Sequence, residues 1–193
     1  MANSNAPVGF KPVRYKSGAP YNGAANMYYV PATDSTALYI GDPVIIAGSA
    51  DADGIATATI ATAGSAGRVT GVVVGIVPSP TITTKYRPAS TACYILVADD
   101  PDLLFECQED AVGGALAAAD VGLNADMVSG SGSTVTGLSA WQLDTSTKAT
   151  TATLQLRIVG FAQRPNNAIG ANAKVLVRFN LPTETGAAGS TGV

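Results

Sequence analysis

Short runs in which hydrophobic and polar residues alternate dominate the chain, and glycine, proline, aspartate and serine separate them. The alternation is clearest in TLQLRIVGF (153–161) and KVLVRFNL (174–181). A period of two places the apolar side chains on one face of a strand, as a half-buried antiparallel sheet requires. The pattern predicts about eleven strands, near 27–30, 37–40, 44–47, 56–61, 68–77, 93–98, 103–108, 126–128, 140–143, 153–161 and 174–181.

Turn residues separate these runs at near-regular intervals, which favours an all-β fold. We expect a small barrel or a sandwich, which could be jelly-roll-like. The best helical candidate is the segment 109–120, where Asp110 is a possible N-cap and two adjacent glycines weaken the pattern. At most one short helix is therefore predicted.

The two ends of the chain differ from its middle. Residues 1–26 contain three prolines and show no convincing periodicity, so we predict an extended N-terminal arm. Residues 27–182 form the predicted β-body, and the small polar residues 183–193 predict a flexible tail. The opening segment lacks the apolar region of a signal peptide, and no apolar run is long enough to span a bilayer. We expect a protein that is made and kept soluble in a cytoplasm.

Composition argues for binding rather than catalysis. Charged residues make up 13% of the chain, against a usual fraction of about 25%, and charge-poor surfaces are common at protein interfaces. Histidine is absent, which removes the most common general base and metal ligand. We interpret Cys93 and Cys107 as two small buried apolar residues rather than a disulfide, because they show no zinc spacing and no disulfide framework. The expected protein is not an enzyme.

Charge is distributed unevenly along the sequence. Residues 1–33 contain the cations Lys11, Arg14 and Lys16 and no acid, whereas residues 88–147 contain acids and no base. A basic arm beside an acidic body is suited to binding an acidic neighbour, either another copy of the chain or a different surface. The alternative is that the three cations are simply solvated.

Tyrosines cluster in the same part of the chain, at Tyr15, Tyr21, Tyr28, Tyr29 and Tyr39. Interleaved with cations, they are similar to a nucleic-acid-binding surface, but the net charge of −3 and the pI near 4.7 oppose that interpretation. Tyrosine and arginine are also favoured anchors of protein interfaces. The predicted partner contacts of the arm are Lys11, Arg14, Tyr15, Lys16 and Tyr21, and the predicted subunit contacts are Tyr28 and Tyr29.

Two acidic segments are candidates for chemistry. In SADADG (49–54), Asp51 and Asp53 match the start of a calcium loop, but no glutamate follows within reach, which favours a turn. For ADDPDLLFECQED (98–110) we rank a β-turn first, a calcium site second and catalysis by paired carboxylates third. The glycines of GSAGRVTGVVVGI do not match a nucleotide-binding motif. No catalytic, metal or cofactor site is predicted.

Several segments resemble known proteins. GFKPVRYKSGAPYNGAANMYYVPATDSTALYIGDPV (9–44) resembles the opening of small structural proteins encoded near the major capsid gene of tailed bacteriophages. YRPASTACYILVADDPDLLFECQED, GGALAAADVGLNAD and ATTATLQLRIVGFAQRPNNAIGANAKVLVRFN are similar to later parts of the same group, so the resemblance covers most of residues 8–181. GDPV and GRVTGVVVGI together are similar to a pattern in phage head-decoration proteins.

The resemblance implies a capsid decoration, or cement, protein on the exterior of the virion, with a β-barrel of the decoration-protein type. Its partners would be the major capsid protein and further copies of itself, with a homotrimer favoured over a dimer, and neither nucleic acid nor membrane. Deletion of residues 1–26 is then expected to leave the body folded and to weaken attachment. The alternatives are a tail, neck or connector-associated β-domain of a phage, and a hydrolase that uses the carboxylates of 99–109.

Overall fold

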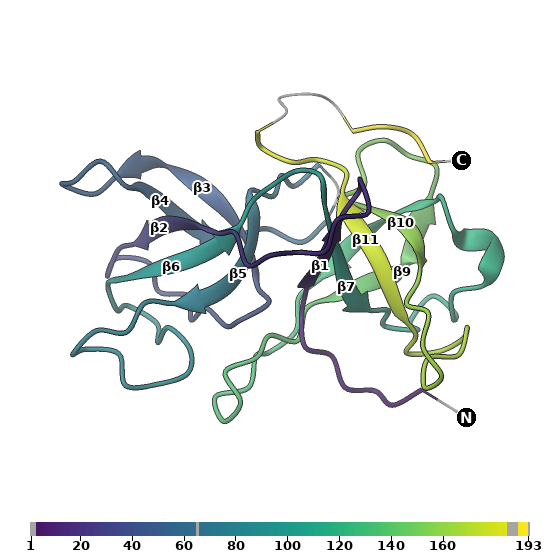
Figure 1. Ribbon diagram of the computed structural model, residues 1–193, viewed down its shortest axis with the longest axis horizontal. Coiled ribbons are helices and arrows are strands. Elements are labelled where there is room, and N and C mark those ends of the chain that lie inside the picture. Colours follow the sequence, from purple (N-terminus) through teal and green to yellow (C-terminus); the bar gives the residue numbers. More distant parts are fainter. Residues whose placement is uncertain (1–2, 65, 185–188, 193) are drawn as a thin grey trace.

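The computed structural model describes residues 3–64, 66–184 and 189–192, and it confirms an all-β fold (Figure 1). The only helical element of this described part is a single 3-10 turn, η1 (Ala118–Asp120). The strands are β1 (Lys11–Tyr15), β2 (Asn26–Val30), β3 (Pro43–Ala50), β4 (Ala56–Ile60), β5 (Gly71–Ile76), β6 (Cys93–Ala98), β7 (Leu103–Gln108), β8 (Asn124–Val128), β9 (Gln142–Ala149), β10 (Leu156–Phe161) and β11 (Lys174–Phe179).

The strands form two modules that lie side by side (Figure 1). Strands β2-β4-β3-β5-β6 close into a barrel, and β1-β7-β11-β10-β8-β9 form a six-stranded sheet. The sequence pattern predicted one body over 27–182 and did not predict its division into two modules. One hydrophobic cluster fills the barrel, and a second, larger cluster lies in the sheet module and continues onto the barrel through Val69, Val72 and Ala98.

The barrel closes through strand β2. This strand pairs antiparallel with β6 along its whole length, and it pairs parallel with β4 at Tyr29 and Thr57. Register shifts in β3 and β5 supply the bends that closure of a small barrel needs. The buried side chains of the barrel are Tyr28, Val30, Leu38, Val44, Ala58, Val73, Ile82, Cys93, Ile95 and Val97.

The six-stranded sheet curls around its own core. A parallel bridge joins Glu109, just after β7, to Leu143 on the far edge strand β9, and the Asp110 amide donates to the Leu143 carbonyl. The predicted alternation is confirmed in β11, where every second residue is buried. In β10 it holds as far as Ile158, and a register shift then makes Phe161 the next buried residue. The large buried side chains of this module include Phe10, Leu103, Phe105, Leu116, Met127, Trp141, Leu143, Leu156, Ile158, Phe161, Val175, Val177 and Phe179.

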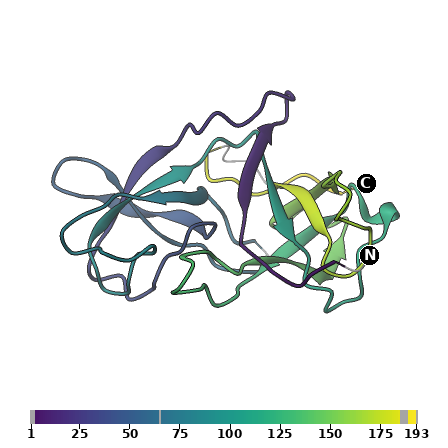
Figure 2. The same ribbon diagram turned by 60° about the horizontal axis from the view of Figure 1, so that its bottom comes forward.

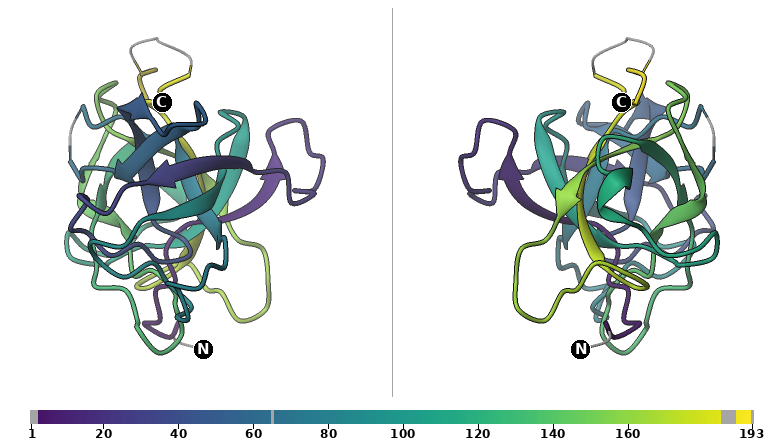
Figure 3. Two further views of the ribbon diagram at one scale, coloured as in Figure 1. Left: turned by 90° about the vertical axis from the view of Figure 1, so that its left-hand side faces the viewer. Right: turned by 90° about the vertical axis from the view of Figure 1, so that its right-hand side faces the viewer.

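The N-terminal segment is built into the sheet and is not a free arm. Strand β1 pairs antiparallel with β7, and Phe10 is only 1% exposed (Figure 2). The chain then turns back along the outer edge of β1, where the Tyr15 amide donates to the Ala19 carbonyl and the Tyr21 amide to the Val13 carbonyl. This loop projects at the side of the molecule (Figure 3). The strand was missed because the register shift after Pro12 breaks the alternation.

The described part of segment 183–193 runs back over the body. The Thr183 amide donates to the Val69 carbonyl, the Ser190 amide donates to the Asn180 side chain, and the Gly192 amide donates to the Thr150 carbonyl. Residues 185–188 and 193, which share the predicted flexible tail, lie outside the described residues.

Of the helix predicted over 109–120, the structure contains only the last turn, η1, and residues 109–117 are not helical. The Asp110 carboxylate accepts from the Val112 amide, as an N-cap would, but it also accepts from the Thr145 amide and hydroxyl of β9. A Cβ on Gly113 would lie 2.3 Å from the Ser146 Cα. The segment is therefore held against β9 as a turn, and tertiary contacts override its weak helical pattern.

The two modules are joined where three segments cross. The Phe10 amide donates to the Gly41 carbonyl at 2.9 Å, and the Ser139 amide donates to the Ile40 carbonyl at 2.9 Å. Gly9 has a φ of 73°, and a Cβ there would lie 2.5 Å from the Gly41 carbonyl oxygen. Only glycine suits this backbone conformation at such a close approach. The Gly-Asp-Pro corner at 41–43 is thus part of the junction between the modules.

Candidate functional site

Two of the three cations predicted to contact a partner lie together on the outer face of the sheet. Arg14 on β1 and Lys16 just after it line a cleft of about 370 Å³, and Arg157 of β10 and Arg178 of β11 line the same cleft. Lys11 lies elsewhere, beside an apolar groove at the junction of the modules. We call Arg14, Lys16, Arg157 and Arg178 the cationic row. The sequence analysis missed Arg157 and Arg178 as members of this site.

Sheet order explains how the cationic row forms. Arg14 is paired with Leu104 of β7, and Arg157 is paired directly with Arg178. Strand β11 lies between β7 and β10, so the cations come from strands that are neighbours in the sheet. The rest of the cleft is lined by Gly18, Leu104 and Val159, none of which carries charge.

The cationic row has no acidic partner among the described residues. The three salt bridges found in that part of the chain involve Arg87, Lys148 and Arg164, and none includes the row. Neutral groups near the end of the chain orient two of its members. Arg178 donates to the Ser190 hydroxyl at 3.3 Å, and Arg157 donates to the same hydroxyl at 3.5 Å and to the Thr191 carbonyl.

The predicted tyrosine contacts divide between core and surface. Tyr15 and Tyr21 are half-buried against the sheet core. Tyr28 points into the barrel, is 8% exposed and donates its hydroxyl to Asp99, so it is not a surface contact. Burial and this hydrogen bond raise its pKa. Tyr29 faces outward and packs on Tyr94, with 5.3 Å between ring centroids.

Tyr29 belongs to an outward face of the barrel on β2 and β6, which the Asp51 carboxylate contacts at the Tyr94 hydroxyl. Met27 and Leu96 are directly paired across β2 and β6, and they are 46% and 37% exposed. Tyr29 and Tyr94 form the next outward pair on the same strands. Neither β2 nor β6 contains a charged residue. We call Met27, Tyr29, Tyr94 and Leu96 the apolar barrel face.

The carboxylates of the segment 99–109 do not converge on one point. Asp99 accepts from Asn26 and Tyr28, and Asp100 accepts from the Asp102 amide at 2.8 Å within a turn. On the following strand, Glu106 forms an ion pair with Arg164 at 2.6 Å. Glu109 is buried and accepts from the Ala111 amide, and burial raises its pKa. The β-turn ranked first for the start of this segment is confirmed.

The candidate calcium loop at Asp51 is also a turn. One carboxylate oxygen of Asp51 accepts from the amides of Asp53 and Ile55, and the other accepts from the Tyr94 hydroxyl at 2.7 Å. The Tyr94 hydrogen bond is the main reason that the pKa of Asp51 is lowered. In the described ranges, no three acidic or cysteine side chains are grouped so that they could hold a metal ion. Cys93 and Cys107 are free and buried, one in each core cluster, as predicted.

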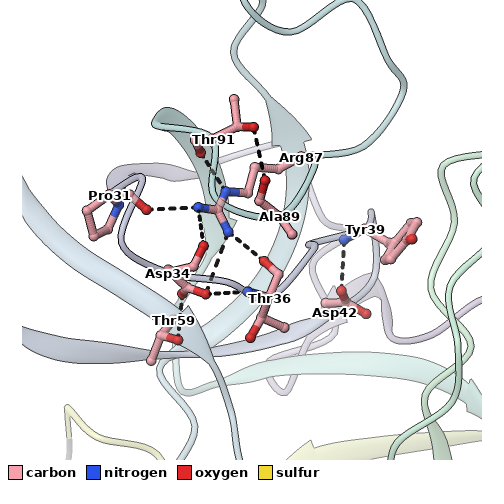
Figure 4. A network of polar contacts seen from close by, with 9 residues as sticks. All are labelled: Pro31, Asp34, Thr36, Tyr39, Asp42, Thr59, Arg87, Ala89 and Thr91. Atoms are coloured by element: carbon pink, nitrogen blue, oxygen red, sulfur yellow. Dashed lines mark hydrogen bonds and ion pairs between the residues drawn. The ribbon is translucent and has the colours of Figure 1, made fainter.

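A buried arginine organises one end of the barrel (Figure 4). Arg87 is fully buried, and its guanidinium donates to the carbonyls of Pro31, Asp34, Thr36 and Thr91. The carboxylate of Asp34 lies 3.6 Å from the guanidinium. All of these acceptors belong to the protein itself, so Arg87 is a structural residue that holds the loops after β2 and before β6.

Asp42, at the junction of the modules, is a buried acid with a raised pKa. Burial raises its pKa to about 6, although the Ser139 hydroxyl and the Tyr39 amide donate to its carboxylate. It also lines an open cleft of about 480 Å³ together with Tyr39 and Trp141. Aspartate between glycine and proline is typical of a turn, and nothing in the sequence indicates that Asp42 is buried.

We expect Asp42→Asn to remove part of the pH dependence of stability. Because the folded pKa of about 6 exceeds the unfolded value of 3.8, the folded state binds the proton more tightly. The contribution of Asp42 to stability is therefore largest below pH 4 and falls as pH rises to about 6, by about 3 kcal/mol in all. Urea unfolding of both proteins between pH 4 and 7 measures this difference. A constant difference between the two proteins across that range would contradict the assignment.

Comparisons with known proteins give no family for this chain. No family model, no curated protein and no solved structure matches it. Among the described residues, no helix is long and apolar enough to cross a membrane.

Proposed function

We propose that this protein is a structural component of a tailed-phage virion that binds the outside of the capsid and clamps neighbouring major capsid subunits. It acts without catalysis and as a homo-oligomer, with a trimer favoured over a dimer. The resemblance of residues 9–44 and later segments to phage structural proteins motivates the proposal.

The cationic row is the observation that carries the proposal. Its four cations line one cleft on the outer face of the sheet, and no acid lines the cleft with them. Such a cleft can bind an anionic partner but offers no carboxylate for catalysis. The apolar barrel face lies on the other module and is a second surface suited to protein contact. Two contact surfaces on two modules allow one molecule to bridge two subunits, and many such contacts reinforce one another on a shell.

Co-sedimentation with undecorated phage heads tests the proposal. We expect saturable binding at a fixed ratio per capsid subunit, and the ratio distinguishes trimeric from dimeric attachment. Leu96→Asp places a charge on the apolar barrel face and should weaken binding by about tenfold or more. Val135→Asp is the matched control, because Val135 is the most exposed large apolar side chain among the described residues and lies outside both surfaces.

If neither the intact protein nor either variant binds to heads, the capsid assignment is contradicted. Binding to tails or necks under the same conditions would favour the alternative virion component. The carboxylate hydrolase gains no support from the geometry, because Asp100, Glu106 and Glu109 face separate partners.

A further inference from the structure

We propose that the cationic row binds a short carboxylate-rich segment of a partner protein in an extended conformation. The inference rests on the proposed function, since it names the chemistry of the capsid surface that this face would contact. It concerns Arg14, Lys16, Arg157 and Arg178 and the cleft between them.

The charge of the cleft selects an anion. Four cations line it, the remaining lining is Gly18, Leu104 and Val159, and no carboxylate among the described residues forms an ion pair with the row. Like charges held side by side, as in the paired Arg157 and Arg178, repel each other unless a ligand or counterion compensates them. An acidic ligand would supply that compensation.

The guanidinium groups favour carboxylate recognition. Arginine presents several N–H donors in a planar fork that matches the two oxygens of a carboxylate. Arg157 and Arg178 are each held by neutral partners, Ser190 and Thr191, which use only part of their donors. The Arg157 Nε is buried without a partner, but the other remaining N–H groups are available, and their orientation is fixed before a ligand arrives.

The dimensions of the row define the length of the ligand. Neighbouring strands lie about 4.8 Å apart, so a row that crosses β1, β7, β11 and β10 extends over about 14 Å. An extended peptide rises about 3.3 Å per residue, and alternate side chains face the same way. A segment of about five residues with acidic side chains at the first, third and fifth positions fits this row.

The surroundings of the row disfavour a nucleic acid. The Lys16 amide donates to the Asp102 carbonyl at 2.8 Å, which places the acidic turn of Asp99, Asp100 and Asp102 against one end of the row. A long phosphate backbone would pass over these carboxylates and be repelled, whereas a short acidic peptide would end before them. The net charge of −3 acts in the same direction.

Peptide binding tests the inference without phage heads. The probes are the blocked peptides Glu-Thr-Glu-Thr-Glu and Gln-Thr-Gln-Thr-Gln, titrated into the full chain and followed by NMR. We expect saturable binding of the glutamate peptide only. Its dissociation constant should rise at high salt, because the Debye screening length shortens to about 3 Å at 1 M ionic strength. Arg157→Glu should raise that constant by about tenfold or more.

Two further variants keep the test clear if Arg157→Glu disturbs the nearby chain end. Arg14→Glu changes an exposed member of the row that has no side-chain partner in the described residues, and we expect the same loss of binding. Lys11→Glu is the matched control, because Lys11 lies on the same strand but outside the row. It should leave peptide binding unchanged.

Four results would overturn the inference. The first is absence of peptide binding, and the second is a loss of peptide affinity in Lys11→Glu equal to that in Arg157→Glu. The third is that inorganic phosphate or a single-stranded oligonucleotide competes for the row more strongly than the peptide does. The fourth is self-association of the intact protein that Arg157→Glu abolishes, which would make a second copy the occupant. If the peptide binds but the protein does not attach to heads, the proposed function fails while the carboxylate site stands. If the protein attaches to heads but does not bind the peptide, the carboxylate site fails while the proposed function stands.

Discussion

Replacement of Arg87 by methionine is expected to lower the free energy of unfolding by about 3–5 kcal/mol. Methionine fills a similar volume but leaves the carbonyls of Pro31, Asp34, Thr36 and Thr91 without their buried donor. Buried acceptors that lose their partners carry a desolvation penalty in addition to the lost hydrogen bonds. Urea unfolding followed by far-UV circular dichroism measures the loss.

Arg68→Met is the matched control for this change. Within the described part of the chain, the Arg68 side chain makes a single long hydrogen bond, 3.4 Å to the Pro182 carbonyl, so its replacement should cost less than about 1 kcal/mol. Arg87→Lys keeps the charge but loses the planar fork, and it should fall between the two. Equal losses for Arg87→Met and Arg68→Met would show that the buried network does not stabilise the barrel.

Phe10→Ala is expected to destabilise the protein by about 3–5 kcal/mol, as for other large aromatic residues in a core. Phe10 is buried, and its ring lies against the ring of Phe179, with 5.7 Å between centroids. Its backbone also holds the Gly41 corner of the barrel. Thermal or urea unfolding followed by the fluorescence of Trp141, which lies in the same core cluster, reports the change.

The Phe10 prediction replaces the expectation that deletion of residues 1–26 leaves the body folded. Such a deletion would remove Phe10 from the core and β1 from the edge of β7. Val13→Ala is the matched control on the same segment, because Val13 is partly exposed and should contribute about 0.5 kcal/mol or less. A stably folded protein after deletion, with an unchanged unfolding midpoint, would restore the free-arm interpretation.

The local pattern of apolar and turn residues was sufficient to predict most strands. Strands β6 and β7 were predicted with the bounds that the structure has, because each is an apolar run limited by turn residues. Alternation also identified the inward faces of β10 and β11. Gln155 is an exception, since the pattern put it on the outer face with Arg157. It is buried because its side-chain amide forms hydrogen bonds with the backbone of Thr62, Gly64 and Gly67.

The cationic row could not be derived from sequence, because it depends on which strands are neighbours. Arg14 comes near Arg157 and Arg178 only through the order β1-β7-β11-β10. The same limit applies to Arg87, a single arginine before a proline, whose burial results from loops distant in sequence. Periodicity describes a strand and its faces, whereas strand order and loop closure arise from contacts between remote segments.

The position of β1 has a consequence for biosynthesis. Its partner β7 follows the entire barrel in the chain, so a ribosome must synthesise all of β2 to β6 before β1 can find its place. During that interval the barrel strands have all their partners and can fold, while β1 presents an unpaired strand edge and Phe10 has no core to enter. Strand β1 thus precedes the barrel in the chain but pairs only after the barrel is complete, and in that interval its open edge exposes the nascent chain to aggregation.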